Sequence, residues 1–167
     1  MTTVGESAAI VSAGQMEWTE ASHGSRYAFR RKQLSDGGGR LGCSLYEVAP
    51  GKSAWPRHYH CGNEEAIYVL EGTATLRLGE QTVEVGPGDY VAMPPGAAAA
   101  HQLINTSTAP IRYLCFSTMD EPEVSFYPDS GKIGVMIGAA PGGIKERRTF
   151  SKTFRVASEV DYWEGEE

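Results

Sequence analysis

The sequence predicts an all-β domain of the sandwich or barrel type, and three observations support this. The 167 residues are enough for one domain with a substantial core and too few for two full domains. The 20 Gly and 9 Pro give the density of turns expected of a loop-rich β protein rather than a helical bundle. Short runs of strand-forming residues recur between these turns, a spacing typical of sandwiches and barrels.

The predicted strands follow one another closely from residue 41 onward. They lie at residues 41–48, 66–70, 73–78, 82–85, 90–93, 101–105 and 111–117. Gly79-Glu80 separates two of them by a two-residue turn, which predicts a local antiparallel hairpin. At least this pairing is therefore expected to form between neighbours in sequence.

The segments on either side of these strands have a different texture. Residues 1–40 are predicted to be an N-terminal arm that closes in the flexible turn 36–39, and 41–120 to be the barrel. Residues 121–167 are predicted to be a C-terminal extension that packs on the barrel or on a dimer partner. Within it, 149–156 alternates as a strand with Phe150, Phe154 and Val156 on one face, and both ways of covering that face stay open.

Composition and charge exclude several classes of protein. Fifteen Lys and Arg against 21 Asp and Glu leave a net charge of -6 and a pI near 5.3, so nucleic acid is not an expected partner. No apolar run approaches the roughly eighteen residues of a membrane-spanning helix, and the first residues lack a basic segment. We therefore expect a cytoplasmic protein without a membrane partner. Cys43, Cys61 and Cys115 are an odd number without Cys-x-x-Cys spacing, which argues against disulfides and a four-cysteine zinc site.

Three of the four histidines fall into one pattern that indicates a metal site. Residues two apart on a strand face the same side, so His58 and His60 present two imidazoles together. A turn at 61–63 lets the next strand bring Glu65 toward the same interior, and His101 follows a Pro-Pro-Gly turn. Three imidazole nitrogens and one carboxylate oxygen suit one divalent ion of Fe, Mn, Co, Ni, Zn or Cu. Taken alone, a His-x-His pair is weak evidence, because two strand histidines often have no ligand role.

The residues around these histidines strengthen the prediction. Gly51, His58, His60, Glu65 and Gly72, followed by Gly88, Pro94, Gly96, His101 and Asn105, resemble the two consensus motifs of the cupin superfamily. The resemblance covers about residues 41–120. It implies a single-domain cupin, whose fold is a double-stranded β-helix, a small jelly-roll barrel with the metal inside near one mouth. It also implies that His58, His60, Glu65 and His101 are the metal ligands.

Two spacings depart from the family pattern. Six residues rather than five separate Gly51 from His58, which lengthens a loop ahead of the ligands. Four residues rather than two separate Gly96 from His101, which leaves Ala99 at the usual ligand position. Either this loop bulges and His101 still coordinates, or the site holds only three ligands. We favour the bulge, because the spacing from His101 to Asn105 is kept.

The resemblance allows several functions. The first is a metal-dependent enzyme of the isomerase, epimerase or lyase type, in which the metal acts as a Lewis acid on a small oxygen-rich substrate such as a sugar or a hydroxy or keto acid. An Fe(II)-dependent dioxygenase and a non-catalytic cupin that binds or senses a small ligand are the alternatives. We expect a homodimer, since exposed edges of small barrels are commonly paired. We expect the turn sequence 127–132 to lie at the edge of the barrel mouth, and we assign it no chemical role.

Overall fold

The protein is built from β-strands and short 3-10 turns, as the all-β prediction requires. The computed structural model describes residues 2–3, 9–35 and 39–166. Within these ranges no helix is long and apolar enough to cross a membrane. The strands are β1 (Thr2–Thr3), β2 (Ala9–Ile10), β3 (Thr19–His23), β4 (Tyr27–Gln33), β5 (Leu41–Val48), β6 (Tyr59–His60), β7 (Glu65–Glu71), β8 (Ala74–Leu78), β9 (Gln81–Val85), β10 (Tyr90–Met93), β11 (His101–Ile104), β12 (Ile111–Thr118), β13 (Glu123–Tyr127), β14 (Lys132–Ile137) and β15 (Phe150–Arg155). The 3-10 turns are η1 (Ala13–Gln15), η2 (Ala97–Ala99), η3 (Pro128–Ser130), η4 (Lys145–Arg147) and η5 (Val156–Ser158).

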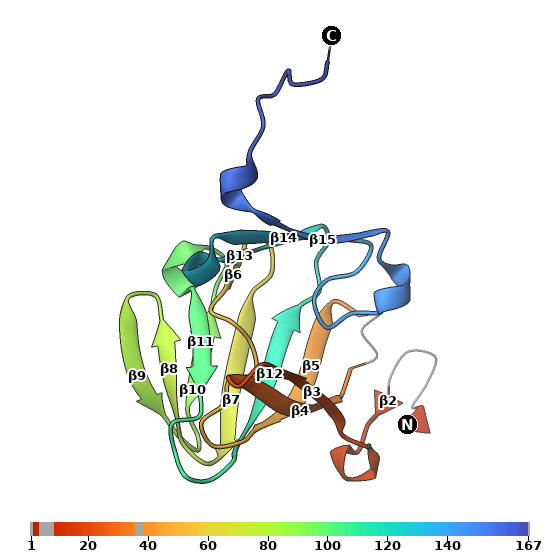
Figure 1. The fold of residues 1–167 in the computed structure, drawn as a ribbon. Coiled ribbons are helices and arrows are strands. Elements are labelled where there is room, and N and C mark those ends of the chain that lie inside the picture. Colours follow the sequence, from red (N-terminus) through yellow and green to blue (C-terminus); the bar gives the residue numbers. More distant parts are fainter. Residues whose placement is uncertain (1, 4–8, 36–38, 167) are drawn as a thin grey trace.

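The largest sheet has six antiparallel strands in the order β10-β7-β12-β5-β4-β3 (Figure 1). Every predicted strand is present within one residue at each end, and β5 and β10 match to the residue. Alternation sets the two faces: Ile67 and Val69 of β7 are buried, whereas Tyr68 and Leu70 are exposed. This pattern directs one side of each strand into the barrel.

A three-stranded sheet, β11-β8-β9, forms the other side of the barrel. The predicted hairpin at Gly79 joins β8 to β9. Gly79 has a φ of 55°, and a Cβ there would lie 2.5 Å from the carbonyl oxygen of Ala98, so only glycine fits this turn. The two sheets enclose a core made of Tyr46, Val48, Ala54, Ile67, Val69, Ala74, Leu76, Val85, Met93, Ala99, Ile111 and Tyr113. The fold is thus a double-stranded β-helix.

A four-stranded sheet, β15-β14-β13-β6, closes one end of the barrel (Figure 1). Its inner face carries polar side chains, among them His60, Ser125 and Lys132, whereas its outer face is mostly apolar and carries Lys152. We call the following residues the outer apolar face: Tyr59, Val124, Phe126, Ile133, Val135, Ile137, Phe150 and Phe154. Phe150 and Phe154 point away from the barrel and stay exposed, so they do not cover it.

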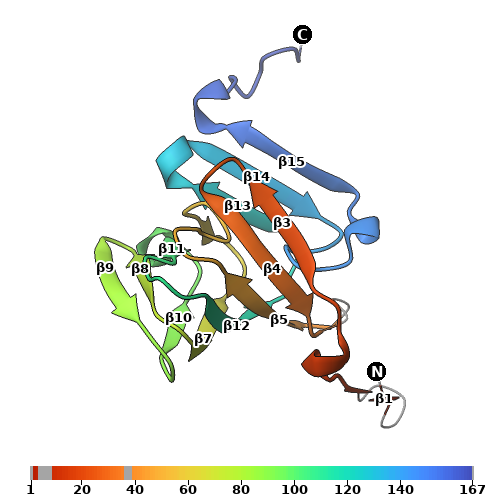
Figure 2. The same ribbon diagram turned by 60° about the horizontal axis from the view of Figure 1, so that its bottom comes forward.

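The strand pairings cross both predicted segment boundaries. β4 pairs with β5 across residue 40, and β13 pairs with β6 across residue 120, so both flanking segments extend the barrel sheets (Figure 2). The expected N-terminal arm therefore contributes two strands rather than a detached arm. The expected turn at 36–39 lies mostly outside the described residues, as does most of the first eight residues.

Candidate metal centre

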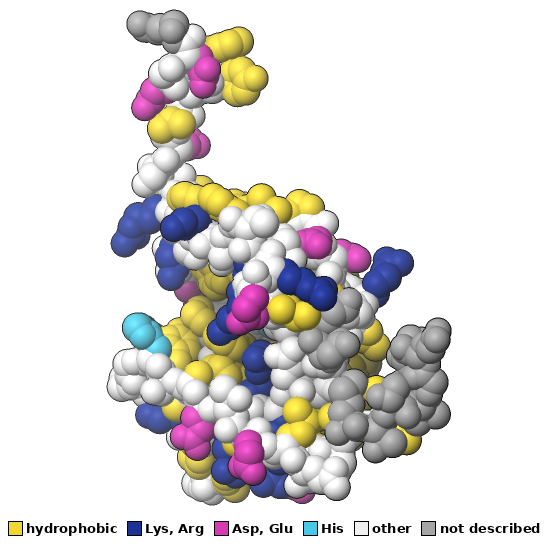
Figure 3. Space-filling view, turned by 90° about the vertical axis from the view of Figure 1, so that its right-hand side faces the viewer, with side chains coloured by type: hydrophobic (Ala, Val, Ile, Leu, Met, Phe, Trp, Pro, Cys, Tyr) yellow, Lys and Arg dark blue, Asp and Glu magenta, His cyan; other side chains and the backbone are white. Residues whose placement is uncertain are grey.

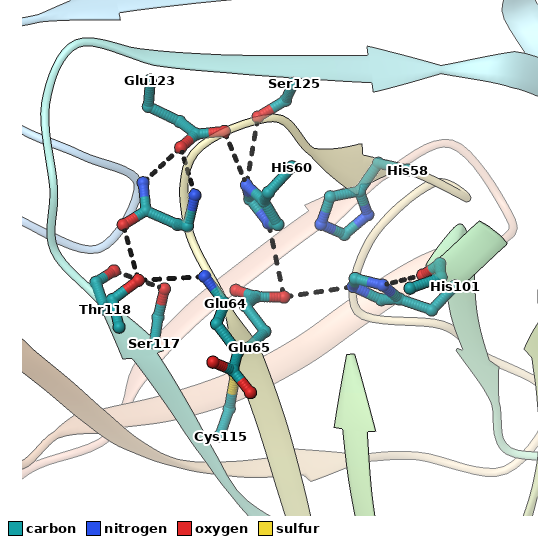
Figure 4. Close-up of polar contacts among 12 residues, drawn as sticks. His58, His60, Glu64, Glu65, His101, Cys115, Ser117, Thr118, Glu123 and Ser125 are labelled. Atoms are coloured by element: carbon teal, nitrogen blue, oxygen red, sulfur yellow. Dashed lines mark hydrogen bonds and ion pairs between the residues drawn. The ribbon is translucent and has the colours of Figure 1, made fainter. Parts of the chain in front are cut away.

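The four residues predicted as metal ligands lie together at the end of the barrel that the four-stranded sheet closes (Figure 4). One nitrogen or oxygen of each residue lies within 4.8 Å of those of the other three: His58, His60, Glu65 and His101. His60 and His101 are buried, and His58 and Glu65 are largely shielded from solvent. Glu64, the rival carboxylate, is exposed and turned away by strand alternation.

The lengthened loop before His101 does not remove this histidine from the cluster. The two extra residues form part of the 3-10 turn η2, and Gly96 donates its N–H to the carbonyl of His60 at 2.8 Å. His58 and His101 then exchange two backbone hydrogen bonds, of 3.1 and 2.8 Å, as an isolated antiparallel pair. Backbone bonding therefore holds the histidines from the two motifs side by side, whereas coordination by His101 stays a prediction.

The outer ring nitrogen of each histidine is held by an acceptor. Nδ1 lies 2.8 Å from the carbonyl of Pro56 in His58 and 2.9 Å from the carbonyl of Ala99 in His101. Because a carbonyl oxygen only accepts, both Nδ1 atoms carry the hydrogen when the rings are neutral, and both Nε2 atoms present a lone pair. His101 Nε2 lies 3.1 Å from an oxygen of Glu65. Ring tautomer and orientation thus suit metal binding.

His60 is held by a carboxylate that sequence reasoning missed. Its Nδ1 lies 3.1 Å from Oε1 of Glu123, which is fully buried, and 3.3 Å from the hydroxyl of Ser125. Asn63 donates both its backbone N–H and its side-chain amide to Glu123 (Figure 4). A carboxylate behind a histidine is the usual support of a metal-binding imidazole. Glu123 belongs to the C-terminal extension and to neither consensus motif, so no sequence signal marks it.

The inner nitrogen of His60 provides a direct test of whether the cluster fits a metal ion. Among the described residues, His60 Nε2 is buried and has no hydrogen-bond partner, and the nearest oxygen of Glu65 is 3.4 Å away. A buried polar atom without a partner is costly unless something satisfies it. A cation bound by the four side chains would do so, and three imidazoles with one carboxylate suit a first-row divalent ion.

The ionisation of the cluster is compatible with this reading. Burial lowers the pKa of His58 to about 4, helped by His101, so its imidazole is neutral at pH 7. Burial also disfavours the charged form of His60, but the neighbouring carboxylates of Glu123 and Glu65 raise its pKa to about 9. Burial would raise the pKa of Glu65, yet the imidazoles of His101 and His60 beside it hold that pKa well below its usual range. A metal bound to His60 would therefore displace the proton on that ring.

The cluster opens into a cavity of about 940 Å³ that runs between the six-stranded and four-stranded sheets. Tyr127 stands beside the cluster, with its ring centroid 6.0 Å from that of His58, and the ammonium of Lys132 lies 5.5 Å from the same ring. Both side chains come from the ends of the turn sequence 127–132, which the sequence placed at the barrel mouth. Arg31 of β4 lines the cavity from the other sheet. The volume is sufficient for a small organic molecule.

Comparison with known proteins supports the fold and the family. A family model described as a cupin domain matches residues 44–117. An uncharacterized protein of Methanocaldococcus jannaschii is 33% identical over 70 residues, which are 42% of this chain and 54% of that protein. The chain thus matches about half the length of this curated relative.

Two solved structures match nearly the whole chain. A candidate sugar phosphate isomerase of Acidithiobacillus ferrooxidans is 26% identical with a TM-score of 0.75, over 91% of this chain and 95% of that one. A cupin-superfamily protein of Silicibacter pomeroyi, described as a sugar phosphate isomerase, is 23% identical with the same TM-score, over 90% and 94%. Each match leaves only about a tenth of this chain uncovered, so both extend beyond the cupin domain into most of the C-terminal segment. The family model therefore assigns residues 44–117 to a cupin domain, and the two structures share the fold of the longer chain.

Proposed function

We propose that His58, His60, Glu65 and His101 bind one divalent transition metal. The observation that carries this proposal is the convergence of four ligand atoms within 4.8 Å, with the buried Nε2 of His60 lacking any described partner. When bound, the metal would act as a Lewis acid that polarises a substrate carbonyl and stabilises the negative charge that develops on its oxygen. Fe, Mn, Co, Ni, Zn and Cu all fit this donor set.

We further propose that the protein is an isomerase of a small sugar-like substrate. The relative from Acidithiobacillus ferrooxidans supports this reaction class, because the match extends beyond the cupin domain into most of the C-terminal segment, which supplies Glu123 and Tyr127. The cavity beside the cluster has the volume of a small-molecule site.

Tyr127 and Lys132 are the side chains that we assign to the substrate. The phenol of Tyr127 lies against His58 and can donate its proton to a substrate oxygen that gains negative charge during enolisation. The ammonium of Lys132, 5.5 Å from the Tyr127 ring, would help to stabilise the same charge. Burial raises the pKa of Tyr127, so the phenol keeps its proton at neutral pH.

Metal analysis tests the site. We expect about one equivalent of a transition metal in protein purified without a metal-binding tag, and none in the His58→Ala/His60→Ala double variant, measured by elemental analysis. The double variant should keep its β-sheet circular dichroism. Full metal occupancy in the variant would disprove the ligand assignment. His101→Ala tests the lengthened loop, and unchanged metal affinity would mean three protein ligands.

Reaction class is tested on the metal-loaded protein. We expect interconversion of aldose and ketose forms of sugars and sugar phosphates, followed by proton NMR, and loss of turnover in Tyr127→Phe without loss of metal. Iron in the protein together with substrate-dependent oxygen uptake would replace this proposal with a dioxygenase. Tight ligand binding with no turnover would replace it with a binding protein.

We also propose that the protein forms a homodimer through the outer apolar face, and that it is cytoplasmic on the sequence grounds given above. Ile137, Phe150 and Phe154 are 37% to 47% exposed on this face, and Figure 3 shows apolar side chains along the top of the body, below the C-terminal tail. Exposed apolar patches of this kind mark contact surfaces. Covering the face with the same face of a second copy would give a closed two-fold dimer.

The C-terminal tail, residues 157–166, indicates that the partner is a second copy. It rises from the side of the sheet that carries the outer apolar face and exposes Val160, Tyr162 and Trp163 (Figure 1). A copy docked on that face would lie beside these side chains. The tail is acidic, through Glu159, Asp161, Glu164 and Glu166, whereas β15 carries Lys152 and Arg155, so exchanged tails would meet opposite charge.

Light scattering after size-exclusion chromatography tests the dimer. We expect twice the chain mass for the wild type, the mass of one chain for Phe154→Ser, and a dimer for Val83→Ser, which removes a similarly exposed apolar side chain from β9. A wild type that is monomeric at all concentrations would contradict the proposal. Deletion of the tail is expected to weaken the dimer without unfolding either chain.

A further inference from the structure

Among the described residues of the six-stranded sheet, Arg31 is the one arginine or lysine on the inner face. The row of cross-strand neighbours that contains it runs through Thr19, Arg31, Tyr46, Tyr113 and Val69. These positions face the interior, because Tyr46, Tyr113 and Val69 are core residues. Arg31 lines the same cavity as the proposed metal ligands. An arginine therefore projects into the barrel from a row that contains no carboxylate.

The adjacent row on the outer face shows how this protein usually places an arginine. It runs through Glu20, Arg30, Glu47, Arg112 and Glu71, with charges that alternate strand by strand. Arg30 lies 2.7 Å and Arg112 lies 2.6 Å from carboxylate oxygens of Glu47. Arg30 and Arg31 are neighbours in sequence, yet within the described part of the chain only Arg30, which points outward, has a counterion.

The contacts of Arg31 leave most of its hydrogen-bonding capacity unused. Its side chain donates a hydrogen bond to the neutral amide oxygen of Gln33 at 3.3 Å, and no carboxylate of the described residues lies within 4.0 Å of it. A guanidinium has five N–H donors in a planar fork that matches the oxygens of a phosphate or a carboxylate. Holding a partly buried cation without a counterion is unfavourable unless a ligand supplies one.

The rest of the cavity is consistent with an anionic ligand. Lys132, Lys145 and Arg148 also line it, and among the residues described none of them forms an ion pair with a carboxylate. The cavity also has three carboxylates in its lining, those of Glu20, Glu65 and Glu146. Arg148 instead donates to the carbonyls of Ala139 and Ala140, which fixes its position. The protein as a whole carries a charge of -6, so unpaired cations in its main cavity are a local exception.

We propose that Arg31 binds an oxyanion of the substrate, a phosphate monoester or a carboxylate, while the proposed metal centre holds the other end of the molecule. This rests on the proposed function for the identity of the metal-bound end. Two strands, β12 and β5, separate β4 from the strand that carries Glu65, so one elongated molecule must span the cavity to reach both. The substrate class is therefore an anionic sugar derivative, either a sugar phosphate or a sugar acid.

Binding of inorganic phosphate tests the proposal separately from turnover. We expect calorimetry to show phosphate binding to both the metal-loaded and the chelator-treated protein. Arg31→Gln should weaken it about tenfold or more in both forms, as expected for loss of a charge-assisted hydrogen bond. Arg30→Gln removes the same charge one residue away on the outer face and should leave the affinity within about twofold of the wild type. Arg31→Lys keeps the positive charge but lacks the planar guanidinium, so its phosphate affinity should lie between those of the wild type and Arg31→Gln.

The outcomes separate the two proposals. Three results would each overturn the oxyanion site. The first is that Arg31→Gln binds phosphate as tightly as the wild type, and the second is that the wild type shows no phosphate binding. The third is that binding is lost when the metal is removed and does not change when Arg31 is replaced. Acetate that competes as well as phosphate would identify a carboxylate as the ligand group, and weaker competition a phosphate. Metal content and circular dichroism of Arg31→Gln should equal those of the wild type. Loss of isomerase turnover alone, with phosphate binding intact, would contradict only the proposed function.

Discussion

The six-stranded sheet and the four-stranded C-terminal sheet are both antiparallel, yet they have opposite polarity. In the first, apolar side chains such as Ile67 and Val69 face the barrel interior and the alternating Glu and Arg row faces solvent. In the second, polar side chains such as Glu123 and Ser125 face inward and Phe154 faces outward. A sheet whose inner face is polar contributes little to a hydrophobic core. The inner face of the four-stranded sheet instead adds side chains to the candidate metal centre, and its apolar outer face favours contact with another surface.

This contrast explains how the C-terminal extension contributes to the candidate metal centre in the barrel. Without β13, the ring of His60 would lose the carboxylate and the hydroxyl that hold its Nδ1. The cupin domain model ends at residue 117, before that strand begins. The candidate site is thus shared between the domain and a sheet added to it.

The largest effect is expected at the inner face of the added sheet. Glu123→Ala should lower the free energy of unfolding by about 3–5 kcal/mol, because the buried polar groups of His60 and Asn63 lose their hydrogen-bond partner. Metal affinity should fall about 10–100-fold. Urea unfolding and metal titration measure the two effects. Val124→Ala, the next residue on the outer face, is the control, and an equal loss there would remove the contrast between the faces.

Removal of the metal is expected to lower the stability of the protein through the same inner face of the four-stranded sheet. If the metal is present at about a thousand times its dissociation constant, chelation should lower the stability of the wild type by about 4 kcal/mol. The His58→Ala/His60→Ala variant should not respond to the chelator. Calorimetric melting with and without chelator measures both proteins, and an equal shift in the variant would show that the chelator acts elsewhere.

A core substitution in the barrel gives the third comparison. Leu76→Ala should cost about 2–5 kcal/mol, since Leu76 is 1% exposed and its removal leaves a cavity. Ile137→Ala on the outer apolar face, where the side chain is 44% exposed, should cost well under half as much at low protein concentration. Denaturant titrations at two concentrations measure both. A cost at Ile137 that matches Leu76 in the monomer would mean that the face is covered within one chain.

The smallest effect concerns the outer charged row. Burial would raise the pKa of Glu47, but hydrogen bonds from Arg30 and Arg112 lower it below the ordinary value of 4.5. A carboxyl with a lowered folded pKa stabilises the protein above that ordinary value and loses the contribution as the pH falls below it. Glu47→Gln should therefore lose about 1 kcal/mol or less at pH 7 and show a flatter decline toward pH 3. Unfolding curves across this pH range check the sign.

Much of the barrel could be predicted because its signals are local. Strand alternation and glycine turns placed seven strands within one residue at each end, and motif spacing selected the four side chains that cluster. Glu123 could not be found in this way, since it meets His60 through a pairing of strands 63 residues apart. The same holds for Arg31: its sequence neighbours do not show that Arg30 has a counterion while Arg31 has none among the residues that the structure describes.

The sequence by itself determined the all-β class, the barrel strands and the identity of the four candidate ligands, because period-two alternation, turn chemistry and motif spacing act over a few residues. Only the tertiary structure decided that the N-terminal segment extends the barrel sheet, that the C-terminal sheet turns its polar face inward, and that Glu123 supports His60. Those outcomes depend on which strands pair across long stretches of chain. Such pairing reflects burial and hydrogen bonding summed over the whole fold, which no short pattern encodes.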